Sequence, residues 1–262
     1  MTFFQSIILG IVEGITEFLP ISSTGHLIAA ANLLGIPDSE FLKSFQIFIQ
    51  LGAILAVVYL YRSTLFVFTE QNFNVWKKVA AAFIPTAIIG FILYGFIKEY
   101  LLDNIAVVVI SLIVGGIILI IFELWQQKKG EGAKYQSIED TPYKVAAYIG
   151  LAQVLAMIPG VSRSGTTIVA GRLLSLSKKA IVDFSFLLAI PVMFGATGLD
   201  MIRAGWGFTT EQFMLLFVGF AASFFVALIV IKWLLSYITK HSFIIFGLYR
   251  ILAGLVFFYL FF

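Results

Sequence analysis

Two polar segments in an otherwise apolar chain contain residue types that suit catalysis on an anionic substrate. Glu13 and Glu17 are one helical turn apart, so both carboxylates lie on one face of a helix. Two like charges on an apolar helix are unfavourable, and a divalent cation or an arginine partner would neutralise them. A wet vestibule around the pair, or a proton on one carboxylate, is the alternative.

Hydroxyl residues begin the helix that follows the break in the first segment. Ser22, Ser23 and Thr24 come directly after Pro20 and Ile21, and such residues cap helix N-termini. A helix N-terminus also presents free N–H groups and the positive end of the helix dipole, which together bind anions. Capping and anion binding are compatible roles for these hydroxyls.

The second segment repeats this pattern and adds a cation, because Arg163 lies between Ser162 and Ser164. A guanidinium forms two parallel hydrogen bonds with phosphate oxygens, so the position suits a phosphate ligand. An arginine near a helix end can instead extend toward lipid headgroups. Its place at the break favours the phosphate role.

His26 follows Ser23 by three residues and therefore lies beside it on one helix face. Next to a hydroxyl and two carboxylates, an imidazole suits general acid–base catalysis. A hydrogen-bonded structural role is the alternative. We predict that Ser23 is the nucleophile and that His26 takes its proton, while attack by His26 itself or by a metal-bound water stays open at this point.

The two polar segments belong to an internal duplication. At a constant offset of 140 residues, positions 10–35 correspond to positions 150–175. The matches include the break itself, where Ser22 corresponds to Ser162 and a glycine follows three residues later in both copies. Identity at polar break positions in a single register indicates duplication, since chance similarity of apolar segments would not include it.

The composition identifies an integral membrane protein. Hydrophobic residues make up 61% and charged residues 12% of the chain, and the mean hydropathy is +1.03, whereas a soluble domain needs more charge to cover its surface. The net charge of +3 is small and dispersed, so no nucleic-acid partner is expected. The chain has no cysteine, which excludes disulfides and thiolate chemistry.

Six apolar stretches are long enough to cross a hydrocarbon core of about 30 Å, which takes roughly 20 helical residues. They lie near 41–62, 77–97, 104–125, 180–202, 212–236 and 242–262. The duplicated segments are instead interrupted near their centres, and each remaining arm is too short to span. Each is therefore predicted to be a re-entrant hairpin of two half-helices, buried in protein or lining a wet cavity.

The predicted fold class is an all-α polytopic membrane protein with an inverted repeat. Each repeat contains one hairpin, which stays on one side, and three spans, an odd number that inverts the next repeat. The first repeat is expected over 1–127 with its hairpin over 1–35, and the second over 143–262 with its hairpin over 143–175. A cytoplasmic linker over 128–142 joins them into one membrane domain.

Lysine and arginine residues in the short loops predict the orientation, because they collect on the cytoplasmic side. The richer side has Arg62, Lys77, Lys78, Lys128, Lys129, Lys134, Lys144, Lys178, Lys179 and Lys240, and the poorer side has Lys43, Lys98 and Arg203. Both termini and the first hairpin are therefore expected at the outer face.

Other polar residues are weaker candidates. Gln46 and Gln50 share a face of the first span and are expected to hydrogen-bond across helices. Charged residues of the second repeat are expected to pair with one another, namely Arg172, Asp183, Asp200, Arg203 and Arg250. Arg250 lies inside the last span, so it needs a buried partner or an anionic ligand.

The two segments closely resemble the paired motifs of the bacterial undecaprenyl-diphosphate phosphatases of the bacitracin-resistance type. They read Glu13-x-x-x-Glu17-x-x-Pro20-x-Ser22-Ser23-Thr24-Gly25-His26 and Pro159-Gly160-Val161-Ser162-Arg163-Ser164-Gly165-Thr166-Thr167. The resemblance covers essentially the whole chain, and neither motif departs from the family pattern. It implies a multi-pass enzyme of the bacterial plasma (inner) membrane. The expected orientation then puts its site toward the outside or periplasm.

The resemblance also implies an activity, namely hydrolysis of undecaprenyl diphosphate to undecaprenyl phosphate and phosphate. This reaction would recycle the lipid carrier for cell-wall synthesis and give bacitracin resistance. The implied cofactor is Mg2+ or Ca2+ held by Glu13 and Glu17, with catalysis by Ser23, His26 and Arg163. The implied substrate-binding residues are Ser22, Thr24, Gly25, Ser162, Ser164 and Thr167. The expected partners are the polyprenyl diphosphate and membrane lipid, with a homodimer left open.

Two other classes compete for the same residues. The type-2 phosphatidic acid phosphatases also combine a serine and an arginine with histidines, one of which follows the Ser-Arg pair. Here the residue six after Arg163 is Val169 and not histidine, so that class is disfavoured. A lipid flippase or anion transporter is the alternative on the same scaffold, because a fold does not decide function. The Ser23 and His26 combination favours chemistry, since a carrier needs no nucleophile.

Overall fold

The structure, a computed structural model, is built from helices and describes residues 1–101, 104–130, 132–204 and 207–262. The side chains at 94, 98, 99 and 200–204 are also outside the described part, and with them the expectations placed on Lys98, Asp200 and Arg203. In chain order the helices are α1 (Phe3–Thr16), α2 (Ser23–Leu33), α3 (Glu40–Leu60), α4 (Arg62–Phe66), α5 (Glu70–Tyr100), α6 (Ile105–Lys129), α7 (Tyr143–Gln153), the 3-10 helix η1 (Val154–Met157), α8 (Arg163–Leu173), α9 (Lys178–Ala204), α10 (Thr210–Ile238) and α11 (Ile244–Phe261).

Six helices within the described ranges are long and apolar enough to cross a membrane, namely α3, α5, α6, α9, α10 and α11. Large apolar side chains such as Phe91, Ile121 and Phe225 are exposed on their outer faces, as expected where lipid is the solvent. The predicted all-α polytopic membrane fold is confirmed, and every predicted span falls on one of these helices.

The duplicated segments form two short helix pairs, α1–α2 and α7–α8, each with a break between its arms. The two longest arms are α1, with 14 residues, and α7 continued by η1 over Tyr143–Met157, and both are too short to span. Directly before α2 and α8, Ser22 and Ser162 have φ angles of 71° and 78°, in the left-handed region that costs a non-glycine residue about 1–2 kcal/mol. The same strained backbone at matched positions supports the duplication and turns the chain sharply at each break.

The helices pack in a twofold pattern in which each short pair contacts the opposite repeat. Helix α1 packs along α10, its counterpart α7 packs along α5, and α6 packs on α11. Gly10 and its counterpart Gly150 permit this contact, because an added Cβ would lie 2.3 Å from the Gly219 carbonyl oxygen and 1.9 Å from that of Ala82. Small residues let membrane helices approach closely where lipid removes the hydrophobic driving force.

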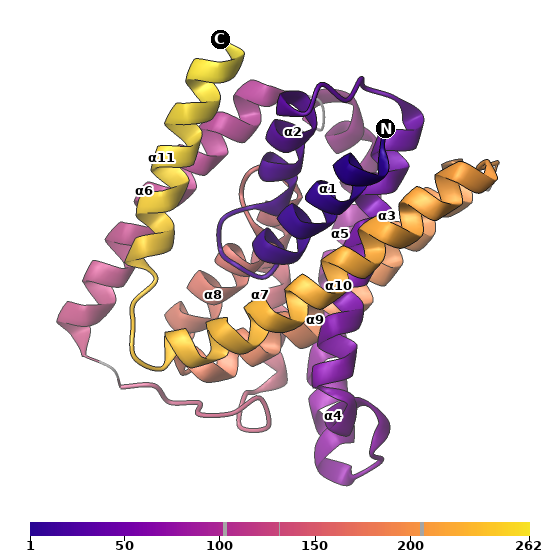
Figure 1. Cartoon of the computed structure of the whole chain (residues 1–262). Coiled ribbons are helices and arrows are strands. Elements are labelled where there is room, and N and C mark those ends of the chain that lie inside the picture. The colour runs from indigo at the N-terminus through magenta and orange to yellow at the C-terminus, as the bar shows by residue number, and fades with distance from the viewer. Residues whose placement is uncertain (102–103, 131, 205–206) are drawn as a thin grey trace.

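The two short pairs enter the molecule from opposite ends. Figure 1 shows both termini at one end with α1 and α2, and the linker between α6 and α7 at the other end, where α7 begins and α8 finishes. Lys78 of α5 donates to the carbonyl oxygens of Ile138 and Glu139, which holds the linker against the helices. Because the two pairs enter from opposite ends, their breaks meet inside the molecule. The residue boundaries of the two repeats stay predictions.

Candidate active site

The N-termini of α2 and α8 converge where the two breaks meet. Ser164 Oγ donates to the Leu19 carbonyl oxygen at 2.9 Å, so the second break touches the first directly. Ser162 Oγ accepts from the Gly165 N–H at 3.2 Å and lies 3.1 Å from Ser164 Oγ. The positive ends of two helix dipoles therefore face one space, which is an environment for an anion.

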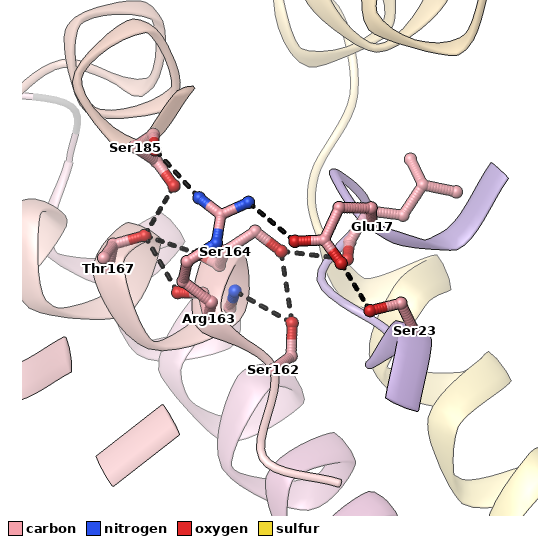
Figure 2. Close-up of polar contacts among 9 residues, drawn as sticks. Glu17, Ser23, Ser162, Arg163, Ser164, Thr167 and Ser185 are labelled. Atoms are coloured by element: carbon pink, nitrogen blue, oxygen red, sulfur yellow. Dashed lines mark hydrogen bonds and ion pairs between the residues drawn. The ribbon is translucent and has the colours of Figure 1, made fainter. Parts of the chain in front are cut away.

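Glu17 uses both oxygens of its carboxylate, one toward the second repeat and one within its own repeat (Figure 2). One oxygen, Oε1, forms an ion pair with Arg163 Nη2 at 3.0 Å, and the other, Oε2, accepts from Ser23 Oγ at 2.5 Å. The two side chains of the ion pair are only 5% and 9% exposed, so water screens the pair little. The sequence predicted that a divalent cation or an arginine would neutralise the acidic pair, and for Glu17 the arginine partner is present.

Arg163 is held from two sides, as Figure 2 shows. Opposite Glu17, its Nη1 donates to the Ser185 carbonyl oxygen at 3.0 Å, and the guanidinium lies 5.8 Å from the centre of the Phe18 ring. Thr167 supports the same point of α9, because its hydroxyl donates to Ser185 Oγ at 2.7 Å. The buried Nε has no hydrogen-bond partner, which leaves the guanidinium with an unused donor.

Glu13 is completely buried one turn before Glu17, and neither of its carboxylate oxygens has a hydrogen-bond partner. A buried carboxylate without a donor is unfavourable, whereas two unused oxygen ligands suit a hard divalent cation. Within the described ranges, no three histidine, aspartate or glutamate side chains lie close enough to hold a metal ion. A cation here would therefore complete its shell with other oxygens.

His26 faces α11 and makes no hydrogen bond to Ser23 among those of the described residues. Its Nδ1 lies 2.7 Å from the Ser22 carbonyl oxygen, and its Nε2 lies 2.8 Å from the Tyr249 hydroxyl, whose ring stacks on the imidazole at 5.5 Å. A carbonyl oxygen only accepts, so Nδ1 carries hydrogen and a neutral imidazole accepts from Tyr249 at Nε2. The expected direct pairing of His26 with Ser23 is not formed, because Glu17 takes the Ser23 hydroxyl.

The remaining residues of the first motif line the start of α2. Ser22 is buried, and its side chain makes no cap hydrogen bond, unlike its counterpart Ser162. The expected capping role therefore holds for Ser162 and not for Ser22. Thr24 is half-buried, and Gly25 fits tightly, because a Cβ there would lie 3.0 Å from Val108 Cγ1.

Arg250 is a buried residue of this region. The sequence indicated that it needs a buried partner or an anionic ligand but did not identify one. It is 2% exposed and donates to carbonyl oxygens from both breaks and from α6. Its acceptors are Pro20 at 3.2 Å, Val161 at 2.8 Å, Gly160 at 2.9 Å, Ser111 at 2.9 Å and Leu112 at 3.4 Å. The guanidinium thus holds the two breaks together. The position of Arg250 inside the last span had predicted a buried partner or an anionic ligand.

The expected pairing among the charged residues of the second repeat is wrong for those that the structure describes. Arg250 binds carbonyl oxygens, Asp183 accepts from the Tyr61 hydroxyl at 2.5 Å, and Arg172 Nη1 donates to the Leu176 carbonyl oxygen at 3.1 Å. Backbone carbonyls freed at breaks and helix ends are acceptors that a sequence pattern does not display.

The comparisons with known proteins agree on one family. The model of the bacitracin resistance protein BacA family matches residues 6–256. Proteins named undecaprenyl-diphosphatase are similar over nearly their whole length: that of Aquifex aeolicus is 52% identical over 98% of both chains, and that of Sulfurihydrogenibium is 49% identical over 98% of this chain and 99% of its own. That of Wolinella succinogenes is 48% identical over 99% of both chains. With its two motifs joined in one buried site, the chain belongs to the bacitracin resistance protein BacA family.

Proposed function

We propose that this protein is a membrane phosphatase that hydrolyses undecaprenyl diphosphate to undecaprenyl phosphate and inorganic phosphate. The observation that carries the proposal is a buried set of contacts where two helix N-termini meet: Ser23 donates a hydrogen bond to Glu17, and Glu17 forms an ion pair with Arg163. The relatives' names supply the substrate. Hydrolysis would recycle the lipid carrier for cell-wall synthesis and so give bacitracin resistance.

The convergence of the two breaks suits a diphosphate headgroup. Arg163 offers a planar fork and one unused donor, and the N–H groups at the starts of α2 and α8 add the positive ends of two helix dipoles. In a site this dry, such fixed donors stabilise charge that develops on phosphoryl oxygens more strongly than water does. The apolar outer faces of the long helices leave the prenyl tail in lipid.

Ser23 is the nucleophile in this proposal, and Glu17 is the group placed to take its proton. The 2.5 Å contact already directs the hydroxyl hydrogen onto the carboxylate. Attack of Ser23 Oγ on the terminal phosphorus forms a phosphoserine, breaks the bond to the bridging oxygen and releases undecaprenyl phosphate. Water then cleaves the phosphoserine, with Glu17 returning the proton to Ser23 Oγ.

His26 is proposed to serve the same reaction from the next turn of α2. The Ser22 carbonyl oxygen fixes its Nδ1, and Tyr249, a residue that is 43% exposed, holds its Nε2. This arrangement orients one imidazole nitrogen toward a partly open side chain, which suits the exchange of a proton with the leaving phosphate or with the hydrolytic water.

A Mg2+ or Ca2+ ion is proposed at the acidic pair. Glu13 would hold it through its two unpartnered oxygens, and Glu17 would share it when the substrate takes over Arg163. When bound, such an ion neutralises charge on the phosphate oxygens. Hard oxygen ligands without cysteine favour these two ions over Zn2+.

We propose that the protein lies in the bacterial plasma membrane with both termini and the active site toward the outside or periplasm. The linker end carries Lys128, Lys129 and Lys134 and is proposed to face the cytoplasm. The α1–α2 pair then enters from the outer face, where carrier lipid would be released. A homodimer is compatible with this placement.

Release of phosphate from undecaprenyl diphosphate by the purified chain in detergent tests the proposed function. A flippase or transporter needs two compartments and would release none there, so the expected time-dependent release separates the two classes. Ser23→Ala should abolish it, and chelation of divalent ions should reduce it strongly. Absence of release with ion-replete, folded protein would overturn the proposal.

A further inference from the structure

A polar pocket lies at the linker end of the molecule, apart from the site where the breaks meet. It has a volume of about 180 Å³, and its lining residues come from the linker, the end of α8, the start of α9 and the end of α10. Its polar lining consists of Gln136, Arg172, Ser177, Lys178, Lys179 and Thr239. This volume is several times that needed for one water molecule, which leaves room for one tetrahedral oxyanion.

The lining is strongly cationic. Three of its residues, Arg172, Lys178 and Lys179, carry positive charge, and none of the described lining residues is acidic. Arg172 is the informative one, because it is only 7% exposed and its Nε has no hydrogen-bond partner. A buried guanidinium in the wall of a cationic pocket whose lining has no acidic residue is a position for an anion.

The pocket has a preformed wall. The linker is fixed to the loop before α9, because the Lys134 and Tyr135 N–H groups donate to the Ser175 carbonyl oxygen at 2.9 and 3.1 Å. The Ser177 N–H donates to the Tyr135 carbonyl oxygen at 2.9 Å, and its hydroxyl accepts from the Ala180 N–H at 3.2 Å. The pocket therefore also contains the capped N-terminus of the long helix α9, where N–H groups and the dipole favour an anion.

The internal duplication provides a comparison within the chain. At the offset of 140 residues, Arg172 corresponds to Asn32. The serines that cap the next helices, Ser39 and Ser177, also correspond, so Lys178 at the start of α9 matches Glu40 at the start of α3. The matching corner at the opposite end of the molecule is therefore not cationic. The charge of the pocket is a feature of the linker end alone, which we place toward the cytoplasm.

We propose that this pocket binds a phosphate group, with Arg172 as its principal ligand, separately from the active site. Arg163 begins the 11-residue helix α8 and Arg172 lies in its last turn, so the two guanidinium-bearing positions are about 14 Å apart along the helix. The ligand chemistry is a phosphate monoester or inorganic phosphate. Its source is either a lipid headgroup in the adjacent leaflet or phosphate in solution.

Phosphate binding to the purified full-length chain tests the proposal without relying on turnover. The Arg163→Gln variant serves as background, so that phosphate held at the active site does not obscure the second site. Binding of inorganic phosphate is measured in detergent by phosphorus NMR line broadening. A second arm uses nanodiscs with phosphatidic acid, with phosphatidylglycerol discs as the control for charge alone.

In this background, one saturable site should persist, and adding Arg172→Gln should weaken it about tenfold or more through loss of charge-assisted hydrogen bonds. Lys179→Gln, at an exposed position, should weaken it by a smaller factor even if Arg172→Gln folds poorly. Lys240→Gln on the same face but outside the pocket should not change it. Saturation by free phosphate assigns a soluble ligand, and binding only in phosphatidic acid discs assigns a lipid headgroup.

Two results would overturn the proposal. One is loss of all phosphate binding in the Arg163→Gln background in both arms. The other is unchanged binding in folded Arg172→Gln and Lys179→Gln variants, which would leave Arg172 as a structural donor to the Leu176 carbonyl oxygen only.

Discussion

Glu17 has the central position among the site residues, because it contacts the proposed nucleophile with one oxygen and the phosphate-binding arginine with the other. The carboxylate orders Ser23 and Arg163 before substrate arrives. It also keeps the charge of a buried guanidinium neutralised in the resting enzyme, where an unpaired charge would be unfavourable.

Glu17→Gln should therefore remove most activity. The amide keeps the shape but accepts no proton and does not neutralise Arg163, so the rate should fall about 10²- to 10⁴-fold. Initial rates of phosphate release in detergent measure the change, with Glu40→Gln, an exposed glutamate at the start of α3, as the matched control. Near-normal, chelator-insensitive turnover in Glu17→Gln would contradict both its role as base and its share in the metal site.

Arg163→Lys should be nearly as damaging as Arg163→Ala. An ammonium cannot reach Glu17, the Ser185 carbonyl oxygen and a phosphate with the geometry of a fork. The expected loss is roughly 2–4 kcal/mol of transition-state stabilisation, or about 30- to 1,000-fold in rate. The kcat/KM of both variants provides the measurement, and full turnover in the lysine variant would show that Arg163 does not bind the phosphate.

At the scale of the elements, the site depends on how two broken helices are held together. Proline and left-handed serine residues lie in the breaks between the arms. The carbonyl oxygens freed at the breaks need donors inside the membrane. Arg250 supplies donors to Pro20, Gly160 and Val161 at once. One side chain of α11 thereby fixes the relative position of α2 and α8.

Arg250→Met should destabilise the fold and the site together. It leaves several buried carbonyl oxygens unpaired, each worth about 1–3 kcal/mol, so the apparent Tm in detergent should fall by several degrees and phosphate release should fall with it. Arg250→Lys, which keeps the charge and part of the hydrogen bonding, should lie between Met and the parent. An unchanged Tm in Arg250→Met would show that the arginine does not hold the breaks.

Much of this element arrangement was predictable from the sequence, because it follows from length, hydropathy and the Pro-Ile-Ser-Ser and Pro-Gly-Val-Ser breaks. The approach of Glu17 to Arg163 followed from the two motifs taken as one site. The contacts of His26 with Tyr249 and of Arg163 with Ser185 could not be predicted, since each partner lies on a long apolar helix with no local pattern that marks the inward face. The Ser23–Glu17 contact was hidden because the turn geometry at residues 18–22 decides which neighbour the hydroxyl meets.

At the scale of the whole molecule, the inverted arrangement gives the two ends different surroundings. The active site is built mainly from the α1–α2 pair, which enters from the end that carries both termini, while the linker marks the opposite end. Function in recycling an external lipid product requires the first end to face outward. The orientation is thus the property of the whole chain on which the physiological role depends.

Single cysteines should report this orientation in intact cells, because the chain has no native cysteine. Asp38→Cys and Gly207→Cys, both at exposed positions of the proposed outer end, should react with a membrane-impermeant thiol reagent. Gly132→Cys, exposed in the linker, should react only after the membrane is permeabilised. The reverse labelling pattern would place the active site toward the cytoplasm.

The chemical claim at the centre of the mechanism is that Ser23 Oγ attacks the terminal phosphorus with Glu17 as its base. The most direct measurement is rapid acid quench of the purified enzyme with undecaprenyl diphosphate labelled in its terminal phosphate, followed by mapping of the labelled residue. We expect an acid-stable phosphoserine at Ser23 that forms and decays at rates compatible with turnover, and that is absent from Ser23→Ala. An acid-labile phosphate that persists in Ser23→Ala would assign the attack to His26, and turnover without any covalent intermediate would assign it to water; either result contradicts the mechanism.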